Sequence, residues 1–142
     1  MNRRVYVAGS RRELARARRA VARLCEHGVE VTYDWTVAPG AEASADSEPA
    51  EGEARDIAER CIAGVRAADV FWLLAPDRGG FECWVELGAV LGGRQFAPVL
   101  TVVSGDIHRS VFVQLVGFRT PSDCGTWRTR SGSVCPSKRS TA

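Results

Sequence analysis

Residues 68–76 (ADVFWLLAP) form an apolar run of strand length that ends in a proline. A near-continuous run of this kind is typical of a strand buried on both faces of a parallel sheet. It leads through a turn with two glycines into an expected helix at residues 82–92, which carries Glu86 close to its start. Ligands of open α/β sheets bind at the carboxyl ends of the strands, so the sequence predicts a carboxylate at that edge. We expect the positive end of the helix to stabilise Glu86 as an anion.

The alternation of strand and helix continues on both sides of this stretch. Apolar or alternating runs predict three more strands, and apolar residues at three- and four-residue spacing predict the helices between them. The expected strands are residues 5–8, 29–33, 70–75 and 98–103, and the other expected helices are residues 11–27, 53–67 and 107–116. This pattern predicts an α/β fold, namely a doubly wound, flavodoxin-like (Rossmann-like) parallel sheet of four to five strands flanked by helices, with strand order 2-1-3-4.

The chain of 142 residues is the length of one domain, which we place at residues 1–116. Residues 40–53 have an acidic composition without periodicity and are expected to form a long loop. From Gly117 onward no apolar period is found. Residues 117–142 are a polar tail rich in Ser, Arg, Thr and Gly, which is either disordered or unrelated to the fold.

Charge and composition argue against several classes of protein. A net charge of +2 does not indicate polymeric nucleic acid or a membrane surface as a partner. No apolar run approaches the ~20 residues of a membrane span, and the N-terminus has no signal-peptide core, so we expect a cytoplasmic protein. The five cysteines lack CxxC spacing and only two histidines accompany them, so we expect reduced thiols and neither a metal nor a cofactor.

The predicted topology brings polar residues from the ends of four strands to one crevice. They comprise a first loop able to meet an anion, an aromatic side chain able to stack on a base, and carboxylates. The candidate substrate-binding residues are Gly9, Ser10, Arg11, Asp34, Trp35, Asp77, Gly80 and Ser104. The structural alternatives are a helix cap for Ser10 and a loop anchor for Trp35. Asp69 begins its strand at the opposite edge, which favours a structural role.

Glu86 is the most unusual of the acidic residues. Its neighbours in the chain include Trp84, Val85 and Leu87, in a helix that is otherwise apolar. A carboxylate in such surroundings is costly unless it is paired or functional. The alternative is a solvated stripe shared with Glu82, which lies four residues earlier on the same helical face.

Four segments together carry a family resemblance. Residues 5–10 (VYVAGS), 33–36 (YDWT), 64–70 (GVRAADV) and 85–89 (VELGA) occur in an order and at a spacing that resemble the nucleoside 2-deoxyribosyltransferase-like superfamily. This group includes small nucleotide N-glycosidases. The resemblance covers roughly residues 4–115.

The resemblance implies cleavage of the N-glycosidic bond of a small-molecule nucleoside or nucleotide. The glutamate of the family's E-x-G motif is the nucleophile and corresponds to Glu86, and a tyrosine on the first strand that positions it corresponds to Tyr6. An acid must protonate the departing base, for which Asp34, Asp56 and Asp77 are candidates. Water as acceptor gives a hydrolase, whereas a second base gives a transferase. Relatives commonly complete the site with a neighbouring subunit, which implies a homodimer.

Two positions depart from the family pattern. Cys61 stands where relatives often carry an acid, and Gly80 stands where nucleotide-hydrolysing relatives carry a serine. These departures favour an alternative, which is a non-catalytic nucleotide-binding or signalling module of the same fold. A close variant of this alternative is a TIR-like domain that cleaves NAD with a similarly placed glutamate. Retention of both Tyr6 and Glu86 favours an enzyme.

Overall fold

The computed structural model describes residues 3–42, 49–77, 79–93, 100–105, 110 and 112–113. Within these residues lies a four-stranded, all-parallel sheet with the strand order β2-β1-β3-β4. Its strands are β1 (Arg4–Ala8), β2 (Glu30–Val31), β3 (Val70–Leu74) and β4 (Leu100–Ser104). The predicted flavodoxin-like, doubly wound order is therefore confirmed.

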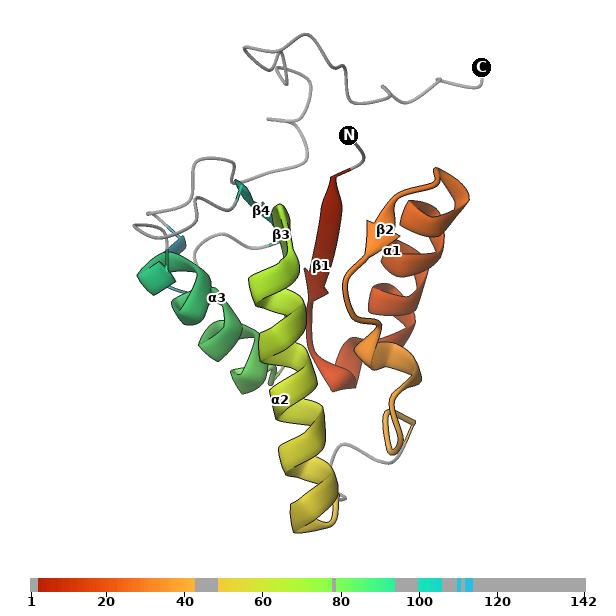
Figure 1. Ribbon diagram of the computed structural model, residues 1–142, viewed down its shortest axis with the longest axis vertical. Helices are drawn as coiled ribbons and strands as arrows, with labels where there is room; N and C mark the ends of the chain where they lie inside the picture. The colour runs from red at the N-terminus through yellow and green to blue at the C-terminus, as the bar shows by residue number, and fades with distance from the viewer. Residues whose placement is uncertain are drawn as a thin grey trace, which may run out of the picture.

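The helices flank this sheet in two groups. They are α1 (Leu14–Glu26), α2 (Glu51–Ala67) and α3 (Phe81–Gly93), with short 3₁₀ segments η1 (Arg11–Glu13) and η2 (Trp35–Val37). Helices α2 and α3 lie side by side, whereas α1 lies apart beside β1 and β2 (Figure 1). Because parallel crossovers are right-handed, the chain places α1 on one face of the sheet and α2 and α3 on the other.

The core forms because strands β1 and β3 are apolar on both faces. In β3, every residue except the half-buried Trp72 is buried, as expected for a central strand. On the face covered by α2, the rings of Tyr6 and Phe71 stack with their centroids 6.0 Å apart. A Cβ atom at Gly64 of α2 would lie 3.0 Å from the Tyr6 ring, so glycine is needed for this close approach.

Two elements differ from the sequence prediction at their ends. The edge strand β2 has two residues rather than the five expected. After it, Thr32 donates its backbone N–H to Val5 O at 2.9 Å and its hydroxyl to Gly64 O at 2.8 Å, which turns the chain toward α2. Helix α2 begins at Glu51 rather than at residue 53, with two glutamates in its first turn, where the helix dipole favours negative charge.

Several sequence predictions fall outside the described residues. These are the first two residues of the expected strand at 98–103, most of the expected helix at 107–116 and the tail at 117–142. The expected acidic loop at 40–53 is described at its two ends, residues 40–42 and 49–53.

The amino edge of the sheet is closed by an ion pair. Asp69 accepts a hydrogen bond at 2.8 Å from the backbone N–H of Arg4, and its carboxylate lies 3.3 Å from the Arg4 guanidinium. The backbone hydrogen bond from Arg4 lowers the pKa of Asp69 most, and the hydrogen bonds from the Arg4 side chain lower it further. The pair joins the amino ends of β1 and β3, which agrees with the structural role expected for Asp69.

Candidate active site

Glu86 and Tyr6 meet in the interior between α3 and β1. The Tyr6 hydroxyl donates a hydrogen bond of 2.6 Å to Glu86 Oε1. Glu86 is only 8% exposed and Tyr6 is fully buried. Eighty positions separate them in the chain, and only the crossover from β1 through α2 and β3 to α3 brings them together. The structure therefore contains a buried carboxylate that accepts a hydrogen bond from a buried phenol.

Burial dominates the electrostatics of this pair. It raises the pKa of Glu86 to about 7, although the hydrogen bonds from Tyr6 and Cys61 act in the opposite direction, and the nearby Glu82 raises it further. Burial, followed by the adjacent carboxylate, also raises the pKa of Tyr6 far above its ordinary value. Tyr6 therefore stays protonated and remains a donor, while Glu86 changes its charge near neutral pH.

The expectation that the start of the helix would stabilise the Glu86 anion is wrong. Helix α3 begins at Phe81, so Glu86 is its sixth residue and lies beyond the first turn. The stabilising effect of a helix terminus falls off within one turn, and the low polarity of the interior outweighs it.

Cys61 is the third side chain at this site. It lies on α2, half-buried, and its thiol interacts with both the Tyr6 hydroxyl and the Glu86 carboxylate. Burial raises the pKa of Cys61 to about 11, so the thiol is neutral and acts as a weak donor. Its position follows from Gly64, one turn later, where the absent side chain lets α2 press against Tyr6.

The polar groups of Ser10, in the loop after β1, form hydrogen bonds to the backbone of the residues that follow it. Ser10 is buried and caps η1, because its hydroxyl accepts the Arg12 backbone N–H at 3.2 Å. Its carbonyl accepts the Glu13 backbone N–H at 3.0 Å. Gly9 lies against Trp35, Leu74 and Ala17, and the half-buried Arg11 begins η1. The capping role weighed for Ser10 is thus the one that the structure shows.

The residues after β2 are also used for internal contacts. Asp34 caps η2, since its carboxylate accepts the backbone N–H of Thr36 at 3.0 Å and the Thr36 hydroxyl at 2.6 Å. Trp35 is buried and donates its indole N–H to Val7 O at 2.7 Å. Its ring packs near Ala17 of α1, on the face of the sheet away from Glu86. The structure therefore shows Trp35 as an anchor of its loop.

The carboxyl ends of β3 and β4 are joined by an arginine that sequence reasoning missed. Arg16 of α1 donates hydrogen bonds to Ala75 O at 2.9 Å and to Ser104 O at 3.2 Å. It also pairs with Glu13, whose other carboxylate oxygen accepts the Asp77 backbone N–H at 3.0 Å. Arg16 is one of several arginines on its helix, so only the topology distinguishes it.

The remaining candidates lie around this edge. Gly80 has a φ of +77° and is buried against Pro76 and Ser10, so the conformation and the packing both require glycine. Ser104 accepts the Trp72 indole N–H at 2.8 Å, and Asp77 is exposed. These residues form a network separate from the Tyr6–Glu86 pair.

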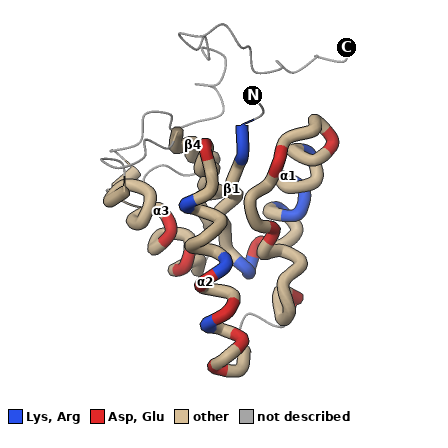
Figure 2. Tube along the Cα trace, in the orientation of Figure 1, with Lys and Arg blue, Asp and Glu red and all other residues tan. Residues whose placement is uncertain are grey.

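Asp56 lies on the exposed side of α2 and pairs with Arg60 at 2.9 Å. Both lie on α2, which begins at the carboxyl edge of the sheet, and both act on Tyr33 electrostatically. Neither contributes to the pKa shift of Glu86. Figure 2 shows that charges of both signs alternate along α2, in contrast to the mostly uncharged α3.

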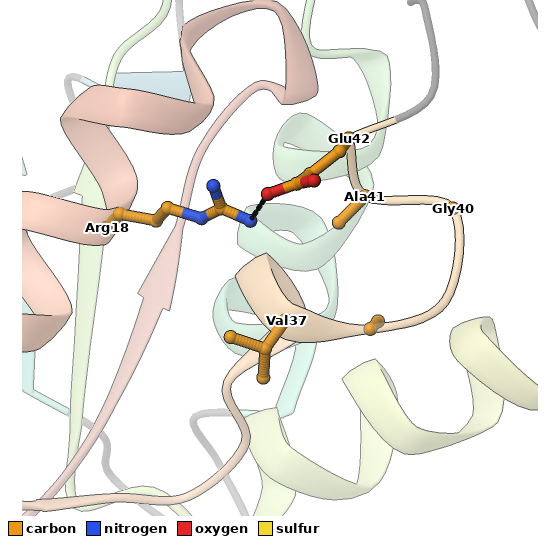
Figure 3. Close-up of a pocket in the computed structure, with 6 residues that line it drawn as sticks. Arg18, Val37, Gly40, Ala41 and Glu42 are labelled. Atoms are coloured by element: carbon orange, nitrogen blue, oxygen red, sulfur yellow. Dashed lines mark ion pairs between the residues drawn. The ribbon is translucent and has the colours of Figure 1, made fainter.

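Two shallow hollows on the described surface lie away from Glu86. One of about 510 Å³ lies between α1 and the segment after η2, and the Arg18–Glu42 ion pair at 2.8 Å crosses it (Figure 3). Another of about 430 Å³ is lined by the outer side of α2 around Ile62. Neither is lined by a buried titratable group, so Glu86, where a short hydrogen bond and a raised pKa coincide, is the candidate site.

The described residues contain no cluster of His, Cys, Asp and Glu suited to a metal ion. In the same part of the chain, no helix has the length and apolar character needed to cross a membrane. Comparison of the sequence with protein-family models and with curated proteins found no match.

Proposed function

We propose that this protein cleaves the N-glycosidic bond of a nucleoside or nucleotide, with Glu86 as nucleophile and Tyr6 as the residue that positions it. The observation that carries the proposal is the 2.6 Å hydrogen bond between Tyr6 and a buried Glu86. The resemblance of the sequence to the nucleoside 2-deoxyribosyltransferase-like superfamily supports the same roles for these two residues.

The chemistry follows from the properties of this carboxylate. Ionised Glu86 attacks the anomeric carbon through one oxygen, while the carbon–nitrogen bond breaks and its electron pair leaves with the base. Positive charge develops on the sugar carbon in the transition state, and an interior carboxylate with little competing solvation interacts with it strongly. The Tyr6 hydrogen bond fixes the orientation of the carboxylate, and water or a second base then takes the sugar from Glu86.

Departure of the base requires a proton. Asp56, which pairs with Arg60 on the outer side of α2, and Asp77, which follows β3, are both exposed and are both candidates for the acid. Asp34 is a weaker candidate, because its carboxylate caps η2. We propose Asp56 for this role, since it lies on the helix that also carries Cys61 to Glu86.

A second function is favoured by a different observation. Cys61 interacts with Glu86 and stands where relatives of the resembled superfamily often carry an acid. A neutral thiol at this position suits a nucleotide-binding or signalling module that performs no chemistry.

The two functions are separated by measuring free-base release with chromatography. The substrates are deoxynucleosides, ribonucleosides, their 5′-monophosphates and NAD, each with wild type, Glu86→Ala and Glu86→Gln. We expect release by wild type alone. Release from NAD alone would identify a TIR-like activity. No release from any substrate by folded wild type, or full activity of Glu86→Ala, would overturn the proposal in favour of the binding module.

A further inference from the structure

A second tyrosine lies beside the candidate active site. Tyr33 follows β2 and is half-buried. A Cβ atom at Gly64 would lie 2.8 Å from Tyr33 Cβ and 3.0 Å from the Tyr6 ring, so both tyrosines contact the same position of α2. Tyr33, Gly64 and Tyr6 are therefore contiguous, with Tyr6 continuing to Glu86.

The surroundings of Tyr33 connect it with Cys61 and with the Asp56–Arg60 ion pair. Burial, then Cys61, raises the pKa of its hydroxyl, and Asp56 and Arg60 also act on it, in opposite directions. Cys61 is the residue that interacts with Glu86. Tyr33 thus lies along α2, with its Cβ against Gly64 and its hydroxyl under the influence of Cys61, Arg60 and Asp56.

Trp35 differs from Tyr33 in its exposure and in the face of the sheet on which it lies, and both matter for stacking. It is 8% exposed, and its indole N–H is used by Val7 O. It also packs near Ala17 on the other face of the sheet. A planar ligand that reaches Glu86 from the carboxyl edge meets the half-exposed Tyr33 and not Trp35.

We propose that Tyr33 is the aromatic surface on which the departing nucleobase stacks, with Asp56 and Arg60 at the edge of the stacked ring. This inference rests on the proposed function. Base–aromatic stacking tolerates every base because each has a π-face, so Tyr33 contributes affinity for the base. Stacking there brings the base toward Asp56, the acid proposed to protonate it. Sugar and anomeric carbon then lie on the side of Tyr6 and Glu86.

The test compares Tyr33→Leu with Tyr33→Phe in the base-release assay, with a purine deoxynucleoside as substrate. Leucine keeps apolar contact with Gly64 and removes the ring, whereas phenylalanine keeps the ring. We expect KM to rise roughly 10-fold in Tyr33→Leu, with kcat reduced less than about 3-fold, and both constants to stay within about 3-fold of wild type in Tyr33→Phe. Affinity for the free purine, measured in a Glu86→Gln background, should fall in the same ratio as KM rises.

The outcomes separate the two proposals. An active wild type with unchanged KM in Tyr33→Leu overturns the stacking role alone. An equal rise of KM in Tyr33→Leu and Tyr33→Phe also overturns the stacking role, because Tyr33→Phe keeps a ring that can stack. An inactive wild type overturns the proposed function and this inference together. Thermal unfolding of both variants shows whether the Leu variant is folded, and free-purine binding then decides independently of turnover.

Discussion

Asp69 and Glu86 are both bound by side chains of β1, Asp69 through Arg4 at the amino end of the strand and Glu86 through Tyr6 near its middle. Asp69 is exposed and paired with a cation, and its pKa is lowered. Glu86 is buried and paired with a neutral phenol, and its pKa is raised to about 7. A cation at the surface compensates the first charge, whereas nothing of opposite charge compensates the second among the described residues.

This difference is the one expected between a carboxylate that serves folding and one that is proposed to serve chemistry. A carboxylate whose charge is already compensated by a guanidinium interacts only weakly with a further positive charge that develops nearby. A buried carboxylate without a counter-ion is destabilised in the resting protein and is stabilised when positive charge appears beside it. Glu86 and Asp69 should therefore differ in their effect on turnover and in the pH dependence of their contribution to stability.

The largest expected effect is on turnover. Glu86→Gln should reduce base release by at least about 1000-fold, because the amide cannot form the bond to the sugar. The matched control is Asp69→Asn, which should retain turnover within about 2-fold. Circular dichroism checks that both variants are folded. Comparable losses in both variants would show that Glu86 is no more than another structural carboxylate.

The pH dependence of stability should have opposite signs at the two sites. Between pH 4.5 and 7 the unfolded Glu86 carboxyl is ionised while the folded one is still protonated. Its contribution to stability is therefore full below pH 4.5 and is lost as pH rises to about 7, by on the order of 3 kcal/mol. The Asp69 contribution is present above its unfolded pKa and is lost as pH falls through its lowered folded pKa.

Urea unfolding from pH 4 to 8 measures the Glu86 contribution. The Asp69 contribution is lost below pH 3.8, so it is measured by extending the series to more acidic urea. Between pH 4.5 and 7, the free energy of unfolding of wild type should fall relative to that of Glu86→Gln, because the neutral amide has no proton to release. Parallel curves for the two proteins across that window would show that Glu86 ionises at an ordinary pKa.

Removal of the positioning phenol should have a smaller effect. Tyr6→Phe takes away the hydrogen bond to Glu86, and hydrogen bonds to charged groups contribute about 1.5–3 kcal/mol, so kcat should fall roughly 10- to 100-fold. The pKa of Glu86 should rise further, which moves the acidic limb of the pH–rate profile to higher pH. A lower kcat with an unmoved acidic limb would mean that Tyr6 acts through packing and not through the carboxylate.

The smallest effect is expected at the amino edge. Arg4→Met removes an exposed partner of Asp69, and surface ion pairs contribute little. We expect Tm to change by no more than a few degrees and base release to be unchanged. A large loss of turnover would contradict the separation of the two carboxylates.

Much of this fold could be predicted from the sequence because the apolar run of β3 is typical of a strand that is buried on both faces, at the centre of a parallel sheet. The order β2-β1-β3-β4 then follows from crossover rules. The short β2 could not be predicted, since Thr32 and Tyr33 have strand-forming side chains and are diverted by a bond from Thr32 to Gly64 on a helix 32 positions later.

The candidate site was only partly predictable for a related reason. The resemblance named Tyr6 and Glu86, and the structure brings their side chains together. The raised pKa of Glu86 depends on its depth beneath α2, which no local pattern encodes. Glu13 and Arg16 look like solvated helix charges in the sequence, yet they tie the ends of β3 and β4 to α1. Trp35 has the residue type of a stacking platform but lies on the other face.

The proposed role of Glu86 is tested most directly by trapping the intermediate. Wild type is quenched with acid during turnover of a deoxynucleoside fluorinated at the 2-position of the sugar, which slows the second step, and peptides are then analysed by mass spectrometry. The account predicts that the peptide containing Glu86 gains the mass of one glycosyl group and that Glu86→Gln gains none. Base release without an adduct, or an adduct on a different residue, would contradict Glu86 as the nucleophile.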